Sequence, residues 1–149
     1  MANSVCDVLL TQTRLAAPAG EIDPSAGAIV DFWGVVRKLE DGREIEGIDY
    51  EAHGAMAEHQ LAMIAQQAAA RFELRCVIIR HRVGFVAVGE ASLFLEVAAG
   101  HRGAAFEASK WIVDELKRKV PIWKHPRFKV DPVKTAARSA TAATVVSTK

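Results

Sequence analysis

The sequence lacks the features that define several large protein classes. Only two of its 149 residues are cysteines, Cys6 and Cys76, and they form no Cys-x-x-Cys pair, which argues against a disulfide framework or a cysteine-based zinc site. No stretch approaches the ~20 apolar residues that a membrane helix needs. The first residues also lack the basic start and long apolar run of a signal peptide. We therefore expect a cytoplasmic protein.

The common cofactor motifs are absent too, so we expect no metal and no cofactor: there is no glycine-rich phosphate loop, no dinucleotide fingerprint and no metal-ligand spacing among the histidines. What is present is typical of one folded domain, because half of the residues are hydrophobic and a quarter are charged. We expect this domain to cover residues 1–130. Residues 131–149 are small, polar and low in complexity, which predicts a flexible C-terminal tail.

The net charge of +1 hides two oppositely charged parts. Residues 1–109 carry 9 basic and 15 acidic side chains, a net charge of −6. Residues 110–149 carry 10 basic and 3 acidic side chains, a net charge of +7. This asymmetry predicts a basic site set against an acidic body.

Hydrophobic periodicity predicts a single α+β domain with a mostly antiparallel sheet and two main helices. The expected helices cover residues 54–73 and 102–119, and Pro121 ends the second one. Apolar or alternating segments predict strands at 5–12, 27–37, 44–50, 74–79, 83–88 and 91–98. Asp41-Gly42 is a turn signal, and it predicts a hairpin between the strands at 27–37 and 44–50.

The stretch Gly100-His101-Arg102-Gly103 lies where the second helix should begin. A helix start presents unpaired N–H groups and a partial positive charge, both of which favour an anion. An arginine can hold a phosphate or carboxylate group with two parallel hydrogen bonds. His101 and Arg102 therefore suggest an anion site, although a solvated helix start explains the same residues equally well.

Basic residues also gather after the second helix, around Lys117 and Lys124. Arg118 and Lys119 are explained by the negative end of a helix dipole. Lys124 differs because it follows Pro121-Ile122-Trp123, an apolar anchor in which we expect Trp123 to pack in the core. Clustered cations and partial burial can adapt a lysine for nucleophilic, basic or electrostatic roles.

The ordered set of motifs resembles the large, catalytic subunit of molybdopterin synthase. The motifs span residues 27–124, and the resemblance implies an α/β-hammerhead-like fold for the domain. They are Gly27-Ala28, Phe32-x-Gly34-x-Val36-Arg37, Tyr50-Glu51, Met56-Ala57-Glu58, His81-Arg82-Val83-Gly84, Gly89-Glu90, His101-Arg102, Ala105-Phe106, Leu116-Lys117 and Val120-Pro121-Ile122-Trp123-Lys124.

This resemblance implies a sulfurtransferase of molybdenum cofactor biosynthesis. Members of the family add two sulfurs to cyclic pyranopterin monophosphate and so form the dithiolene of molybdopterin. The sulfur arrives on a small ubiquitin-like partner whose C-terminal Gly-Gly ends in a thiocarboxylate. Two large subunits form a central dimer with a small subunit at each end, which implies a heterotetramer.

The resemblance also implies roles for individual residues. Lys117 and Lys124 correspond to the catalytic lysines, and their separate roles stay open. The residues implied to bind substrate are Val35, Val36, Arg37, His101, Arg102 and His125. From spacing alone, Arg37 is an ordinary surface arginine.

Two alternatives remain open at this stage. Pro126 stands where the family has a glutamate, so the chain could be a catalytically impaired relative that only binds a ubiquitin-like partner or an anionic ligand. Alternatively, residues 110–134 could form a basic module that binds nucleic acid through phosphates and through stacking on Trp111, Trp123 and Phe128.

Overall fold

The structure is a computed structural model that describes residues 4–130. The predicted tail at 131–149 lies outside the described residues. Within the described part, no helix is long and apolar enough to cross a membrane.

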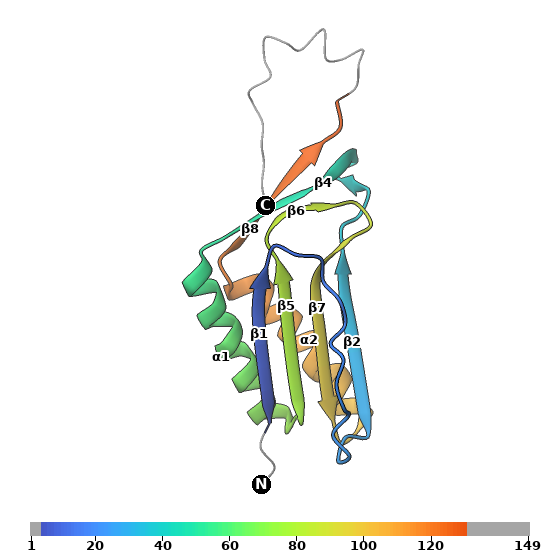
Figure 1. Cartoon of the computed structure of the whole chain (residues 1–149), viewed down its shortest axis with the longest axis vertical. Helices are drawn as coiled ribbons and strands as arrows, with labels where there is room; N and C mark the ends of the chain where they lie inside the picture. Colours follow the sequence, from blue (N-terminus) through green and yellow to red (C-terminus); the bar gives the residue numbers. More distant parts are fainter. Residues whose placement is uncertain (1–3, 131–149) are drawn as a thin grey trace.

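The larger of two sheets forms the body of the molecule (Figure 1). Its strands are β1 (Val5–Thr11), β5 (Cys76–Arg82), β7 (Ala91–Ala99) and β2 (Ala28–Val35), in that order across the sheet. The β1–β5 pair is parallel, whereas β5–β7 and β7–β2 are antiparallel. The expected α+β fold with a mostly antiparallel sheet is confirmed, and β1 and β2 are the edge strands.

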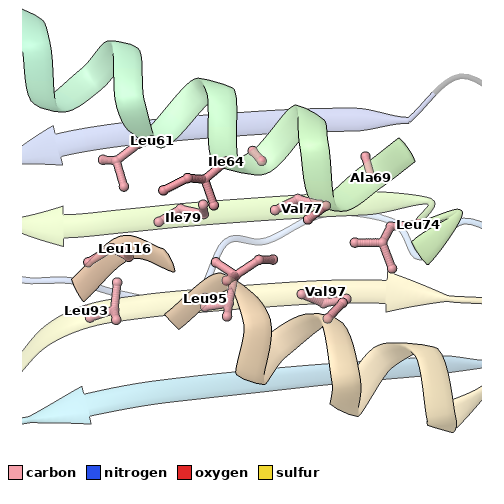
Figure 2. Packing of buried hydrophobic residues seen from close by; sticks show 14 of the residues in the cluster. Leu61, Ile64, Ala69, Leu74, Val77, Ile79, Leu93, Leu95, Val97 and Leu116 are labelled. Carbon is pink, nitrogen blue, oxygen red and sulfur yellow. The ribbon is translucent and has the colours of Figure 1, made fainter. Parts of the chain in front are cut away.

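Two helices, α1 (Gly54–Phe72) and α2 (Arg102–Lys119), cover one face of this sheet. Both confirm the predicted helices to within one residue. Their apolar stripes meet the alternating inward residues of the strands, as Figure 2 shows for Leu61 and Ile64 of α1 above Val77 and Ile79 of β5. These four side chains are at most 1% exposed, so the two helices and the main sheet share one close-packed core.

A smaller sheet lies at one end of the main sheet. Its strands are β3 (Leu39–Glu40), β4 (Arg43–Ala52), β6 (Gly84–Ala87) and β8 (Ile122–Phe128). The central strand β4 pairs antiparallel with β6 and with β8. The inward face of this sheet forms a second, small core, made of Val36, Ile45, Ile48, Tyr50 and Val86.

The predicted hairpin is correct in its turn and wrong in its partner strand. Asp41 and Gly42 both have positive φ, 52° and 76°, as a two-residue hairpin turn requires. However, the strand that pairs with β4 at this turn is the short β3, while β2 pairs with β7. A register shift at Gly34/Val35 ends the pairing of β2, after which the chain passes into the smaller sheet.

The strand β8 was not predicted, because a basic stretch with two prolines shows no alternation of polar and apolar residues. Pro126 fits there because β8 pairs on one side only, with β4, and an edge strand tolerates a residue without an N–H. The expectation that Trp123 packs in the core is wrong, since this side chain is 50% exposed.

Candidate functional site

Lys117 lies in the last turn of α2, where Lys117, Arg118 and Lys119 complement the negative end of the helix dipole. Arg118 Nη2 and Lys119 Nζ lie 2.6 and 2.9 Å from the two carboxylate oxygens of Glu115. Hydrogen bonds from Arg118 and then Lys119 lower the pKa of the Glu115 carboxyl. Lys117 is exposed and does not take part in this cluster. Two of the three cations therefore have an acidic partner, whereas Lys117 has none within residues 4–130.

Lys124 lies in β8, directly opposite Tyr50 of β4. Residues opposite one another in a sheet share a face, so Lys124 and Tyr50 lie on the inward side of the smaller sheet. Tyr50 is buried, which raises its pKa, and its ring contacts that of His81 edge-on at 5.2 Å. The main-chain carbonyl of Pro121 accepts a hydrogen bond from the His53 N–H at 3.1 Å. The side chain of Lys124 is thus exposed, while the strand that carries it is held in place against β4.

His125 lies on the opposite face of β8, because successive residues of a strand alternate. Its Nε2 lies 3.0 Å from the Glu51 carboxylate, and Arg127 on the same face donates to Asp49 at 2.8 Å. The structure therefore places His125 in a row of outward ion pairs and does not bring it to the face that carries Lys124.

Arg37 follows Val36, whose main-chain N–H and carbonyl both form hydrogen bonds. The Val36 N–H donates to the Glu90 carbonyl at 3.0 Å, and the Gly89 N–H donates to the Val36 carbonyl at 2.9 Å. Val36 itself is buried in the small core, whereas Val35 is half-exposed and Arg37 is exposed. Arg37 therefore projects from the junction of the two sheets, at the same end of the molecule as Lys117 and Lys124. We call this end the lysine end.

Sequence reasoning gave Glu90 no role, although the quoted motif Gly89-Glu90 contained it. The carboxylate accepts hydrogen bonds from Arg14 at 2.6 Å and from Arg82 at 2.9 Å, and it also accepts the Ala87 N–H at 3.3 Å. These bonds, the one from Arg14 most strongly, lower the pKa of Glu90. They fix the turn that holds Val36, so Glu90 positions the backbone that leads to Arg37.

His101 and Arg102 lie at the other end of α2. This helix has 18 residues and is therefore about 27 Å long. His101 is its N-cap but makes no side-chain cap hydrogen bond, and the first turn contains no acidic residue. Within one chain, His101 and Arg102 therefore lie about one helix length away from the lysine end.

The cations of the described chain fall into two groups. Residues 4–130 contain 16 lysines and arginines. Twelve of them form an ion pair, a hydrogen bond or a contact with an aromatic ring. The four that make no such contact within residues 4–130 are Arg37, Arg102, Lys117 and Lys124. These are the four lysines and arginines that the resemblance assigned to the site.

A model of the MoaE protein family matches residues 7–119 of the chain. The chain belongs to the MoaE protein family. The matched range contains Arg37, His101, Arg102 and Lys117, whereas Lys124 and His125 lie beyond it.

Two relatives of this MoaE-family chain carry the same name. A molybdopterin synthase catalytic subunit from Oryza sativa subsp. indica is 46% identical over 102 residues, which cover 68% of this chain and 53% of the rice protein. One from Thermoplasma volcanium is 42% identical over 101 residues, 68% of this chain and 74% of that protein. The chain therefore matches about half the length of the rice relative.

A solved structure supports the same assignment of fold. The crystal structure of molybdopterin synthase from Staphylococcus aureus is similar with a TM-score of 0.69 and 31% sequence identity. The likeness covers 74% of this chain and 80% of that one. This agreement confirms the fold class predicted from the sequence.

Proposed function

We propose that this chain catalyses sulfur transfer to cyclic pyranopterin monophosphate and so forms molybdopterin. The observation that carries the proposal is that Arg37, Arg102, Lys117 and Lys124 have no charge partner within residues 4–130. Leaving four cations without anionic neighbours contributes nothing to the fold, and it suits a site whose anions arrive with substrate and partner. The relatives named molybdopterin synthase catalytic subunit supply the class of reaction.

The chemistry divides between the two groups of residues. Arg37, His101 and Arg102 hold the phosphate of the pterin, for which an arginine fork and a helix start are suited, and Val35 and Val36 border Arg37. The thiocarboxylate sulfur attacks a pterin carbon and displaces an oxygen substituent of that carbon, which takes up a proton as it leaves. Water or an amine then breaks the acyl–sulfur bond, so that the sulfur stays on the pterin and the acyl end departs as a carboxylate or an amide. Lys117 stabilises the thiocarboxylate or accepts its acyl end, and Lys124 moves protons or steadies charge on the pterin. Neither cysteine is needed, since the sulfur arrives on the partner.

Two further proteins complete the assembly that we propose. The first is a small ubiquitin-like subunit with a C-terminal Gly-Gly thiocarboxylate, which brings the sulfur in the cytoplasm. The second is another copy of this chain, because His101 and Arg102 lie about 23 Å along α2 from Lys117. One substrate cannot contact both groups on one chain, so a dimer, and a heterotetramer overall, is part of the proposal.

The test is a reconstitution of the reaction. The purified chain is mixed with the thiocarboxylated small subunit and cyclic pyranopterin monophosphate, and the dithiolene product is measured. Product that depends on both additions is expected. The matched control is the small subunit with an ordinary C-terminal carboxylate, which must give none. Partner binding without product, even at high concentrations of the chain, contradicts the proposal.

A catalytically impaired relative is the second candidate function, favoured by the proline at position 126. In the structure Pro126 of β8 lies opposite Ile48 of β4 and is partly buried. A proline offers neither a side-chain carboxylate nor a main-chain N–H. Lys124 lies on the same strand and is nevertheless exposed. The reconstitution decides between the two functions, because an impaired relative binds the partner and makes no product.

Nucleic-acid binding by residues 110–134 is disfavoured by the pairing of the charges there. Lys110, Arg118, Lys119, Arg127 and Lys129 all contact acidic side chains. Among the predicted stacking residues, Trp111 lies against Phe72 with ring centroids 6.1 Å apart, and Phe128 carries the Arg43 guanidinium at 4.1 Å. Trp123 is the one of the three that is half-exposed.

A further inference from the structure

The turn at Gly100 joins β7 to α2 and leads directly into His101 and Arg102. It lies at the end of the main sheet that is far from the smaller sheet (Figure 1). On one side it is closed by Gly27, whose N–H donates to the Ala99 carbonyl at 2.9 Å. A Cβ on Gly27 would collide with the Gly100 carbonyl oxygen. The main chain that precedes β2 is therefore in direct contact with this turn.

The side chain of Arg75 closes the other side of the turn. Its Nε donates to Ser25 Oγ at 3.0 Å, and its Nη1 donates to the Glu73 carbonyl at 2.7 Å. The remaining nitrogen, Nη2, lies against Gly100, where a Cβ would be 3.3 Å away from it. One guanidinium thus holds together the segment after α1, the segment before β2 and the turn before α2.

Ser25 is itself fixed in place by Asp23. The Ser25 N–H and hydroxyl donate to Asp23 Oδ1 at 2.8 and 2.7 Å. The hydrogen bond from the hydroxyl, then that from the N–H, and more weakly the positive charge of Arg75 lower the pKa of the Asp23 carboxyl. Because the hydroxyl donates to Asp23 and accepts from Arg75, the three side chains form one continuous series of hydrogen bonds.

An arginine near the end of a helix can also serve the fold alone. Arg71, in the last turn of α1, is of this kind, because its guanidinium lies 5.1 Å from the Phe72 ring and 5.5 Å from the Trp111 ring. Arg75 differs because it contacts the turn that leads to Arg102. The N-cap residue of α2 makes no side-chain cap hydrogen bond, so neighbouring segments hold this turn in place of a cap.

We propose that Arg75 positions Arg102 to bind the phosphate of the cyclic pterin, by fixing the turn that leads to Arg102. A charged side chain that is already oriented loses less conformational entropy on binding than one that follows a loose turn. This inference rests on the proposed function for the identity of the ligand, whereas the contacts of Arg75 do not depend on it. Arg75 is a positioning residue, since its Nε and Nη1 are engaged within the fold.

The KM for the cyclic pterin measures this positioning. Arg75→Met keeps most of the length of the side chain and removes its hydrogen bonds, so it is expected to raise KM about fivefold while kcat stays within about twofold. The matched control is Arg71→Met, which should leave both constants unchanged. A loss of thermal stability that the two variants share does not account for a change in KM in only one of them. An unchanged KM for Arg75→Met overturns the proposal.

Two further variants distinguish positioning from a direct contact with the phosphate. Arg75→Lys keeps the positive charge but lacks the planar fork that reaches both Ser25 and Glu73, so we expect it to raise KM as Arg75→Met does. In the double variant Arg75→Met/Arg102→Ala, KM should stay within about twofold of that of Arg102→Ala, because Arg75 acts through Arg102. A wild-type KM for Arg75→Lys, or effects that multiply to about fiftyfold in the double variant, overturns the positioning role.

Hydrogen exchange of main-chain N–H groups tests the turn without using the reaction. The N–H groups of Gly27 and Ala105 form hydrogen bonds of 2.9 and 3.3 Å on either side of the turn. Both should exchange faster in Arg75→Met than in Arg71→Met and the wild type, while the Val120 N–H at the far end of α2 should not change. Equal exchange in the three proteins overturns the role of Arg75. If the wild type makes no product, the proposed function fails, and exchange still decides whether Arg75 holds the turn.

Discussion

At the last turn of α2, Arg118 and Lys119 contact the buried Glu115, whereas at the first turn His101 and Arg102 contact no acidic side chain within residues 4–130. The basic residues of the last turn stabilise the negative end of the helix dipole. Arg102 lies at the positive end of the same dipole, where a cation is unfavourable. Contacts within the fold explain the basic residues of the last turn, and we propose that an anion from outside the chain binds those of the first turn.

The same contrast distinguishes the cations of β8 and of the residue that follows it. Arg127 contacts Asp49, and Lys129 contacts Glu44 at 3.3 Å. Lys124 lies on the same strand, exposed and without such a partner. Substituting paired and unpaired cations therefore tests the contrast, since the first should affect stability alone and the second should affect the reaction.

The largest effect is expected for Lys124→Ala. Removing one group that stabilises charge in a transition state commonly lowers the rate by about 100-fold or more, and we expect a loss of that size in the rate of product formation. The matched control is Lys129→Ala, which removes a surface ion pair one residue beyond the end of the same strand and should leave the rate within about twofold. Comparable rates for the two variants contradict the assignment of Lys124.

A smaller effect is expected for Arg102→Ala. Loss of a charge-assisted contact to the phosphate should raise the KM for the cyclic pterin by about tenfold, since such a contact contributes about 1.5 to 3 kcal/mol. The melting temperature should not fall, because the substitution removes a cation from the positive end of the helix dipole. Arg118→Ala reverses the pattern, with an unchanged KM and a lower melting temperature. An unchanged KM for Arg102→Ala removes this residue from the site.

Two acidic side chains also lie next to each other in the main sheet. Asp31 of β2 and Glu96 of β7 lie opposite one another. Partial burial, and then a hydrogen bond with Asp31 and the repulsion between the carboxyl groups, raise the pKa of Glu96 from 4.5 to about 7, against the opposing effect of Arg80. The folded chain therefore keeps a proton that the unfolded chain releases above about pH 4.5. Its contribution to stability is present below pH 4.5 and is lost as the pH rises through 7.

Glu96→Gln should therefore raise the melting temperature at pH 8 by a few degrees and have a smaller effect at pH 5, where Glu96 is already protonated. Thermal unfolding followed by circular dichroism over this pH range measures the difference. Glu107→Gln, on the exposed side of α2, serves as the control and should show no such pH dependence. A gain that is constant with pH would falsify the role given to the Asp31–Glu96 pair.

The smallest effect is expected at the N-cap of α2. His101 makes no side-chain cap hydrogen bond, and asparagine is among the best N-cap residues, so His101→Asn should stabilise the chain by about 1 kcal/mol. Binding of the cyclic pterin should weaken at the same time, because the shorter asparagine side chain replaces the imidazole that we propose contacts the phosphate. Urea unfolding and pterin titration on one preparation measure both. A variant that gains stability and binds the pterin as tightly shows that His101 is not needed in the site.

The sequence predicted what depends on local pattern. The apolar stripe through Leu61 and Ile64 predicted α1, and the predicted limits of α2 proved correct. β8 was missed because its residues are ordered by pairing with β4, a contact between segments about 75 residues apart. The same kind of contact explains the wrong partner assigned to the hairpin, since no local pattern shows that β2 pairs with the distant β7 and leaves β3 to pair with β4.

The residues that we propose for the site came from the sequence, whereas their arrangement came from the structure. Motif order supplied Arg37, His101, Arg102, Lys117 and Lys124, and neither their spacing nor their charge showed that α2 separates two of them from the others. His125 was grouped with Lys124 because it follows directly in the sequence, whereas in a strand that adjacency places it on the opposite face. The role of Glu90 required the folded chain, because its partner Arg14 lies 76 residues away, in the segment that follows β1.

The most direct test of the contrast between the two groups of cations uses neighbouring positions of α2. Lys117→Ala and Lys119→Ala remove the same side chain two residues apart, one without a partner within residues 4–130 and the other in contact with Glu115. The measurement is the rate of dithiolene formation with saturating small subunit and cyclic pterin. We predict a rate reduced by about 100-fold for Lys117→Ala and a rate close to wild type for Lys119→Ala. Equal rates in the two variants would contradict the account.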